Sequence, residues 1–88
     1  NIEYGFNITN YNETYSSAVV VGNLNVLDSV GNGNVYIKNV VVLGDIVISA
    51  KNVKSVELTD VKARRIIVEG ENNPVRVVYN DNVIIAKK

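Results

Sequence analysis

A short motif recurs along this chain at nearly constant spacing, and it limits the possible folds more than any other feature. The motif is an apolar residue, any residue, an Asn or Asp, and one further residue. Its polar positions are separated by 16, 21 and 20 residues. They are Asn23, Asn39, Asp60 and Asn80. A repeat period near 20 residues is typical of a solenoid, in which each repeat forms one turn of a coil.

The residues between these positions favour strands over helices. Val and Ile supply 27 of the 88 residues, and β-branched side chains suit a pleated sheet. No window has apolar residues at helical spacing. In the first three copies a Val stands two positions before the motif, at Val19, Val35 and Val56. Arg76 takes that position in the fourth copy, where a one-residue bulge would restore the phase.

These patterns predict an all-β protein, a small parallel β-solenoid of three to four turns over residues 18–88. Asn and Asp tolerate the left-handed backbone region, so the four repeated positions are expected to stack as a column of turns. Residues 1–17 are polar and Tyr-rich, and we expect them to form an N-terminal arm. The side chains predicted to point inward are Val19, Val21, Ile37, Ile46, Ile48, Leu58, Ile66 and Val68.

An antiparallel β-sandwich is the alternative fold. Turn residues every 8–12 positions are typical of sandwiches as well, and Gly31-Asn32-Gly33-Asn34 suits a hairpin turn. In that fold, residues 1–15 would form a strand donated to a neighbouring molecule, completing its sheet.

Two short segments resemble a known family. Gly22-Asn23-Leu24 and Gly44-Asp45-Ile46 lie 22 residues apart and look like the Gly-(Asn/Asp)-aliphatic steps of bactofilins. The likeness covers residues 18–70. Bactofilins are bacterial β-helices that polymerise end to end without nucleotide. The resemblance therefore implies a right-handed parallel β-helix and self-assembly.

Composition argues against several classes of function. The formal net charge is zero, whereas a nucleic-acid-binding domain normally carries a basic excess. No apolar run approaches the ~18 residues of a membrane span. The chain has no Cys and no His, which removes the usual zinc ligands and the usual base-assisted nucleophiles. We expect no metal, no cofactor and no enzymatic activity.

The remaining catalytic hypothesis is a carboxylate pair that cleaves a polysaccharide. Asp45 and Asp60 are the candidates, with Arg64 or Arg65 as an electrostatic helper. Such a pair needs a separation of about 5–9.5 Å in a cleft. Because Asp60 falls on the predicted turn column, a structural role is the preferred interpretation and no catalytic residue is assigned.

Two glycosylation sequons lie in the N-terminal segment. They begin at Asn7 and Asn12, as Asn7-Ile8-Thr9 and Asn12-Glu13-Thr14. Both fall outside the predicted solenoid. They make these residues candidate glycan attachment sites and predict an extracellular or cell-surface protein.

The C-terminal end of the predicted solenoid suggests self-association. Val83, Ile84 and Ile85 form an apolar strand followed by two lysines, and an open solenoid end exposes core side chains unless it is capped. We expect these three residues to form a face for head-to-tail contact with another copy, as in a filament or surface layer. The alternative function is a glycan- or surface-binding module of a larger extracellular protein.

Overall fold

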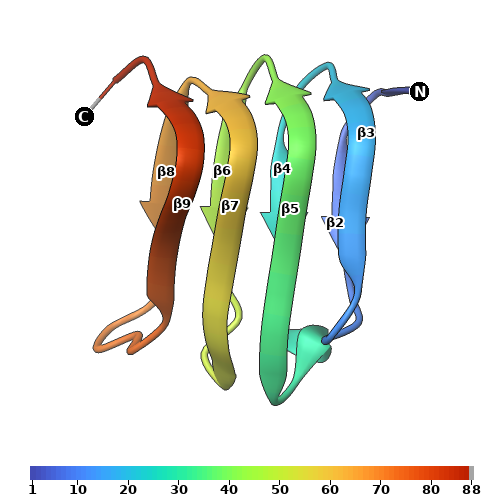
Figure 1. Cartoon of the computed structure of the whole chain (residues 1–88). Coiled ribbons are helices and arrows are strands. Elements are labelled where there is room, and N and C mark those ends of the chain that lie inside the picture. Colours follow the sequence, from blue (N-terminus) through green and yellow to red (C-terminus); the bar gives the residue numbers. More distant parts are fainter. Residues whose placement is uncertain (88) are drawn as a thin grey trace.

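The computed structural model describes residues 1–87 and is a flattened parallel β-solenoid of about four turns (Figure 1). Strands contain 62% of the chain, and a three-residue 3-10 turn, η1 (Asp28–Val30), follows β4. The first sheet has the order β1 (Ile2–Glu3), β3 (Thr14–Val20), β5 (Gly33–Val42), β7 (Val53–Ala63) and β9 (Arg76–Ile85). The second sheet has the order β2 (Phe6–Ile8), β4 (Leu24–Val26), β6 (Asp45–Ile48) and β8 (Arg65–Val68).

Each turn gives one strand to each sheet, and the two sheets face each other across the core. Neighbouring strands are parallel throughout residues 1–87, with partners 17–22 residues apart in sequence. Ile37, for example, pairs with Leu58, and Ile46 pairs with Ile66. The predicted solenoid is confirmed. The antiparallel sandwich is wrong, because Gly33 starts a strand that pairs in parallel with β7 instead of closing a hairpin.

The core consists of aliphatic columns that run from turn to turn. Within each column, the paired residues of successive strands have side chains on the same side of the sheet, so like side chains stack. Ile37 and Leu58 form one column, and Leu24 and Ile46 form another; all four are almost completely buried. Among residues 1–87, no helix has the length and apolar character needed to cross a membrane.

A column of left-handed residues bends every full-length strand of the first sheet. Its members have φ between 50° and 56° and occupy equivalent positions: Ser17, Asn39, Asp60 and Asn82. A residue in this conformation shifts the inward-outward alternation by one position. In β5 the buried residues are accordingly Val35 and Ile37 before Asn39, then Val40 and Val42 after it.

The observed column differs from the predicted one at its two ends. Asn39 and Asp60 belong to it, but Asn23 precedes β4 at the opposite corner, and Asn80 lies beside a register shift in β9. Ser17 and Asn82 take the end positions, so the true spacing is 22, 21 and 22 residues. The wrong first register also explains why Val19 and Val21, predicted to be buried, are exposed. Val68, also predicted to be buried, is exposed as well; it pairs with the buried Ile48 but lies in the last described strand of the second sheet.

Residues 1–17 form the first turn of the solenoid and not a separate arm. β1 pairs with the C-terminal part of β3, and β2 pairs with the whole of β4. The predicted boundary at residue 17 falls inside β3. Short polar segments escape detection as strands because their pairing depends on the edge offered by the next turn.

Candidate assembly interface

The C-terminal end of the solenoid exposes an edge of the second sheet. β8 pairs with β6 on one side, and no strand within residues 1–87 pairs with its other side. β8 and β9 lie together at the C-terminal end of the solenoid, one in each sheet (Figure 1). An unpaired strand edge offers a row of free N–H and C=O groups to another strand. Among the described residues, β8 therefore forms the unpaired edge of the second sheet at this end.

An open pocket of about 540 Å³ lies at this same end. Core-column side chains of β8 and β9 contribute to its lining, including Ile66, Tyr79, Val83 and Ile85. Tyr79 continues the Ile37–Leu58 column, yet it is 56% exposed because nothing described covers it. The pocket is therefore the uncovered end of the hydrophobic core.

The three residues predicted as an assembly face do not point the same way. Val83 and Ile85 are half-buried and pack against the core cluster, whereas Ile84 is 57% exposed. All three line the end pocket or its rim. Tyr79 and Ile66 belong with them. Tyr79 could have been found from the sequence had the fourth repeat been placed in the correct register.

At the N-terminal end, an aromatic pair covers the core. Phe6 of β2 and Tyr15 of β3 stack with ring centroids 4.3 Å apart and an interplanar angle of 14°. The Tyr15 hydroxyl is buried and has no hydrogen-bond partner among the described residues. Burial, helped by the negative charge of Glu3, raises the pKa of Tyr15. The first turn thus combines apolar rings with one unsatisfied polar group.

Charge is distributed unevenly along the solenoid axis. The first 37 residues contain three acidic side chains and no Lys or Arg. Residues 38–88 carry all nine basic side chains and six of the nine acidic ones. The N-terminal turns are therefore net negative and the later turns net positive. Such an arrangement favours contact between unlike ends over contact between like ends.

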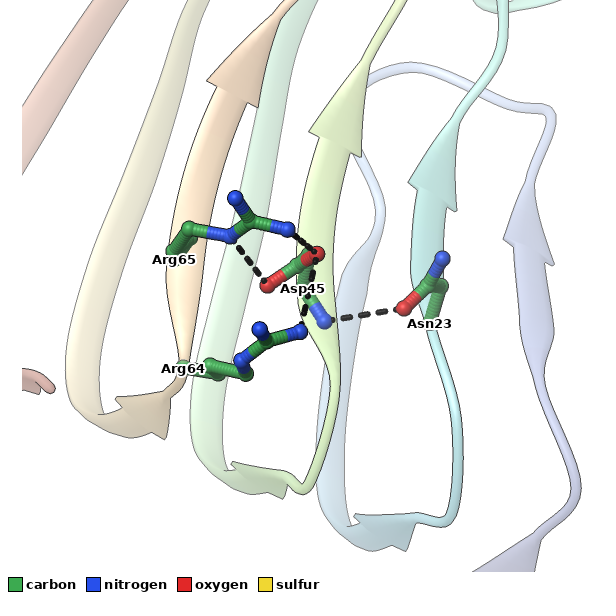
Figure 2. A network of polar contacts seen from close by, with 4 residues as sticks. All are labelled: Asn23, Asp45, Arg64 and Arg65. Atoms are coloured by element: carbon green, nitrogen blue, oxygen red, sulfur yellow. Dashed lines mark hydrogen bonds and ion pairs between the residues drawn. The ribbon is translucent and has the colours of Figure 1, made fainter. Parts of the chain in front are cut away.

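A polar network fixes the corner that leads into the second sheet (Figure 2). Asp45 is 6% exposed, and Arg65 donates to its two carboxylate oxygens at 3.2 and 3.0 Å. The Arg64 guanidinium lies 4.0 Å from the same carboxylate. The Asp45 backbone N–H donates to Asn23 Oδ1 at 2.9 Å. The side-chain hydrogen bond from Arg65, together with the positive charge of both arginines, lowers the pKa of Asp45.

The two candidate carboxylates of the catalytic hypothesis occupy separate structural positions. Asp45 begins β6 in the second sheet and is paired with arginine, whereas Asp60 lies in the left-handed column of β7. Asp60 Oδ1 accepts a hydrogen bond of 2.9 Å from Asn82 Nδ2 in the next turn. Both carboxylates therefore support the stacking of adjacent turns. Within residues 1–87 no cluster of acidic side chains has the grouping needed to bind a metal ion.

Both sequon asparagines are exposed in the first turn. Asn7 lies in β2, and its Oδ1 accepts a hydrogen bond of 3.0 Å from Asn25 Nδ2. Asn12 has a positive φ in the turn before β3, and its Oδ1 accepts from the Asn34 N–H at 3.2 Å. The amide oxygen is engaged in each case.

Comparisons with protein-family models, with curated proteins and with solved structures gave no significant match. The resemblance to bactofilins thus has no support from a family match, and the solenoid class follows from the strand pairing alone.

Replacing Asp45 by Asn is expected to lower the stability of the fold at neutral pH. It should also make that stability change less as the pH is lowered. The pKa of Asp45 is lowered in the folded state. The ionised carboxylate therefore stabilises the fold fully at pH values above the pKa of an unfolded Asp, about 3.9. This stabilisation is lost as the pH falls through the pKa of Asp45 in the folded state. The urea midpoints of the two proteins should therefore differ at pH 7 and converge below about pH 4.

Asp81→Asn is the matched control, because Asp81 is an exposed carboxylate in β9. Its urea midpoint should follow that of the unmodified chain at every pH. An Asp45→Asn protein as stable as the unmodified chain at pH 7 would show that the arginine pair contributes nothing to folding.

Proposed function

We propose that this protein is a structural subunit that stacks end to end with copies of itself, forming a filament or surface layer outside the cell. The observation that carries the proposal is the open C-terminal end. There the core side chains of β8 and β9 line a pocket of about 540 Å³ beside an unpaired strand edge. A second copy is a suitable cover, because its first turn carries the stacked Phe6 and Tyr15 rings. These two residues begin the columns that end at Ile66 and Tyr79.

The energetics support association at accessible concentrations. Covering one end would remove roughly 400 Å² of apolar surface from water, about 10 kcal/mol gross at ~25 cal/mol per Å². Association costs at least about 4 kcal/mol. A surplus near 6 kcal/mol corresponds to a dissociation constant of tens of micromolar, roughly. New backbone hydrogen bonds along β8 would strengthen the contact further.

The extracellular location is part of the proposal and rests on the two sequons. Asn7 and Asn12 are exposed, and both lie on or beside the outer surface of the first turn. A chain without cysteine is compatible with secretion. Mass spectrometry of the protein expressed in a glycosylating host should find glycan on at least one of the two. Complete absence of glycan would remove this support for the location while leaving the assembly unaffected.

Sedimentation velocity at about 500 μM, roughly tenfold above the estimated constant, combined with negative-stain electron microscopy, tests the assembly. The unmodified chain should form extended oligomers. Tyr79→Lys places a charge in the end pocket, where the side chain can still reach water, and should yield monomers with an unchanged far-ultraviolet β-signal.

Asn52→Lys is the matched control for that variant. Asn52 is an exposed turn residue between β6 and β7, so the same added charge sits away from both ends. This protein should assemble like the unmodified chain. The proposal fails if the unmodified chain is monomeric at this concentration, or if Asn52→Lys disrupts assembly as strongly as Tyr79→Lys.

A further inference from the structure

One side of the solenoid exposes a group of apolar side chains. It lies where the strands of the first sheet pass into the second sheet, at the row of corners drawn along the top of Figure 1. Val19 of β3 pairs with Val41 of β5 near this row, and Val21 and Leu43 follow in the corners themselves. Val19, Val21 and Leu43 are 37%, 39% and 59% exposed. A contiguous apolar surface of this kind marks a site of interaction.

The same row becomes basic beside β7. Lys62 pairs with Val41 and so continues the column, and Arg64 occupies the next corner. Both side chains are exposed. We call the whole group the corner patch; it consists of Val19, Val21, Val41, Leu43, Lys62 and Arg64. Its strands β3, β5 and β7 each have a neighbour on both sides, so the patch belongs to the side of the solenoid and not to either end.

The exposed charge at this row of corners is positive. The described acidic residues at these corners are Glu3, which is half-buried, and Asp45, which is buried and paired with Arg65. Asp60 lies further back along β7, where it accepts a hydrogen bond from Asn82. The opposite row of corners, where the second sheet passes back into the first, carries four carboxylates: Glu13, Asp28, Glu69 and Glu71.

We propose that the corner patch docks on a lipid surface that carries anionic headgroups. Apolar side chains next to lysine and arginine are the combination that binds the boundary between headgroups and acyl chains. Leu43 and the three valines enter this boundary, and Lys62 and Arg64 contact the headgroup phosphates. This docking goes beyond the proposed end-to-end assembly and does not depend on it.

Charge complementarity favours a lipid surface over a second copy lying side by side. Two copies that met through the same patch would bring Lys62 and Arg64 of each into the contact without an exposed carboxylate to receive them. Uncompensated like charges oppose such a contact. A layer of anionic headgroups supplies the opposite charge at every point of the patch. The row is also parallel to the solenoid axis, so that it can lie along a flat surface (Figure 1).

The sequon asparagines leave this side of the solenoid free. Asn12 lies at the opposite row of corners, and Asn7 lies in β2 of the second sheet. Glycans at these positions would not cover the corner patch. Copies stacked end to end would align their patches into one stripe, and linked binding sites hold a surface more tightly than single ones.

Co-flotation with lipid vesicles tests the docking. The protein is used at about 1 μM, far below the dissociation constant estimated for end-to-end assembly, so that single copies are measured. It should float with vesicles in which about a quarter of the phosphatidylcholine is replaced by phosphatidylglycerol. With phosphatidylcholine alone it should stay in solution. Added salt should weaken the binding, because salt screens the lipid charge.

Removing two cations from the patch should weaken this binding strongly. Each basic side chain near an anionic surface strengthens binding about fivefold, so Lys62→Gln/Arg64→Gln should lower the vesicle affinity about 25-fold. Lys51→Gln/Lys54→Gln is the matched control, because it removes two exposed cations from the opposite row of corners. Its affinity should change less than about twofold. The urea midpoints of both variants check that the fold is intact.

A tryptophan in the patch provides a second measurement, because the chain has no Trp of its own. The fluorescence of Leu43→Trp should shift to shorter wavelength when phosphatidylglycerol vesicles are added, since indole settles at the membrane interface. Tyr79→Trp is the comparison. Tyr79 is 56% exposed, close to the 59% of Leu43, but it lines the end pocket and not the corner patch. Its fluorescence should not shift.

Three results would overturn the docking and leave the end-to-end assembly untouched. The first is equal binding to both kinds of vesicle, or binding to neither. The second is an equal loss of affinity in the two double variants, because the position of the cations would then be irrelevant. The third is a Leu43→Trp shift that needs no vesicles and accompanies dimer formation in sedimentation velocity, which would assign the patch to a second copy. Vesicle binding by a chain that never oligomerises would support the docking and contradict only the assembly.

Discussion

Replacing Ile37 by Asp is expected to destabilise the folded state severely. Ile37 is 1% exposed and lies between Tyr15 and Leu58 in an inward column of the first sheet. A carboxylate there has no partner, and burying an unpaired charge in a core costs more than about 4 kcal/mol. A domain of this size has about 5–15 kcal/mol of total stability, so this loss removes from about a quarter to most of the margin. Far-ultraviolet circular dichroism and urea unfolding report the loss.

The neighbouring residue supplies the control for this change. Lys38 is exposed on the same strand, and Lys38→Asp adds the same carboxylate on the outer face. Its free energy of unfolding, measured by urea denaturation, should change by less than about 0.5 kcal/mol, as is usual for surface positions. An Ile37→Asp protein that keeps its melting temperature would show that the column register is wrong.

Replacing Gly44 by Ala is expected to destabilise the chain by about 3 kcal/mol, near the upper end of the range for overpacking. A Cβ atom at Gly44 would lie 2.4 Å from the Gly22 carbonyl oxygen and 2.4 Å from Asn23 Oδ1. Neither group can move easily. Gly22 O accepts the Gly44 N–H at 2.8 Å, and Asn23 Oδ1 accepts the Asp45 N–H. The adjacent turns would therefore have to separate at this corner.

Leu43→Ala is the comparison for that variant, because Leu43 is 59% exposed immediately before the corner. It should change the urea midpoint little, while Gly44→Ala lowers it clearly. Equal midpoints for the two proteins would mean that the turns are not packed as tightly at Gly44 as the structure shows.

The fold class followed from the sequence because its causes are local and repeated. β-branched residues dominate the chain, and a motif near 20 residues long recurs, so parallel turns with stacked side chains could be predicted. Asn39 and Asp60 could be placed in the left-handed column for the same reason, since Asn and Asp tolerate that backbone. The apolar run at residues 83–85 could likewise be predicted as a strand, and it lies in β9 beside the end pocket.

The tertiary structure decided the register at both ends and the role of the first turn. Ser17 and Asn82 stand in the column because the strands next to them place them there, and serine alone is a weak signal for a left-handed backbone. Residues 1–17 contain few aliphatic side chains, and β1 and β2 exist because β3 and β4 offer them an edge. Local preference predicts which segments are strands, but the pairing partners are distant in sequence, and they determine which side chain faces the core and which edge remains free.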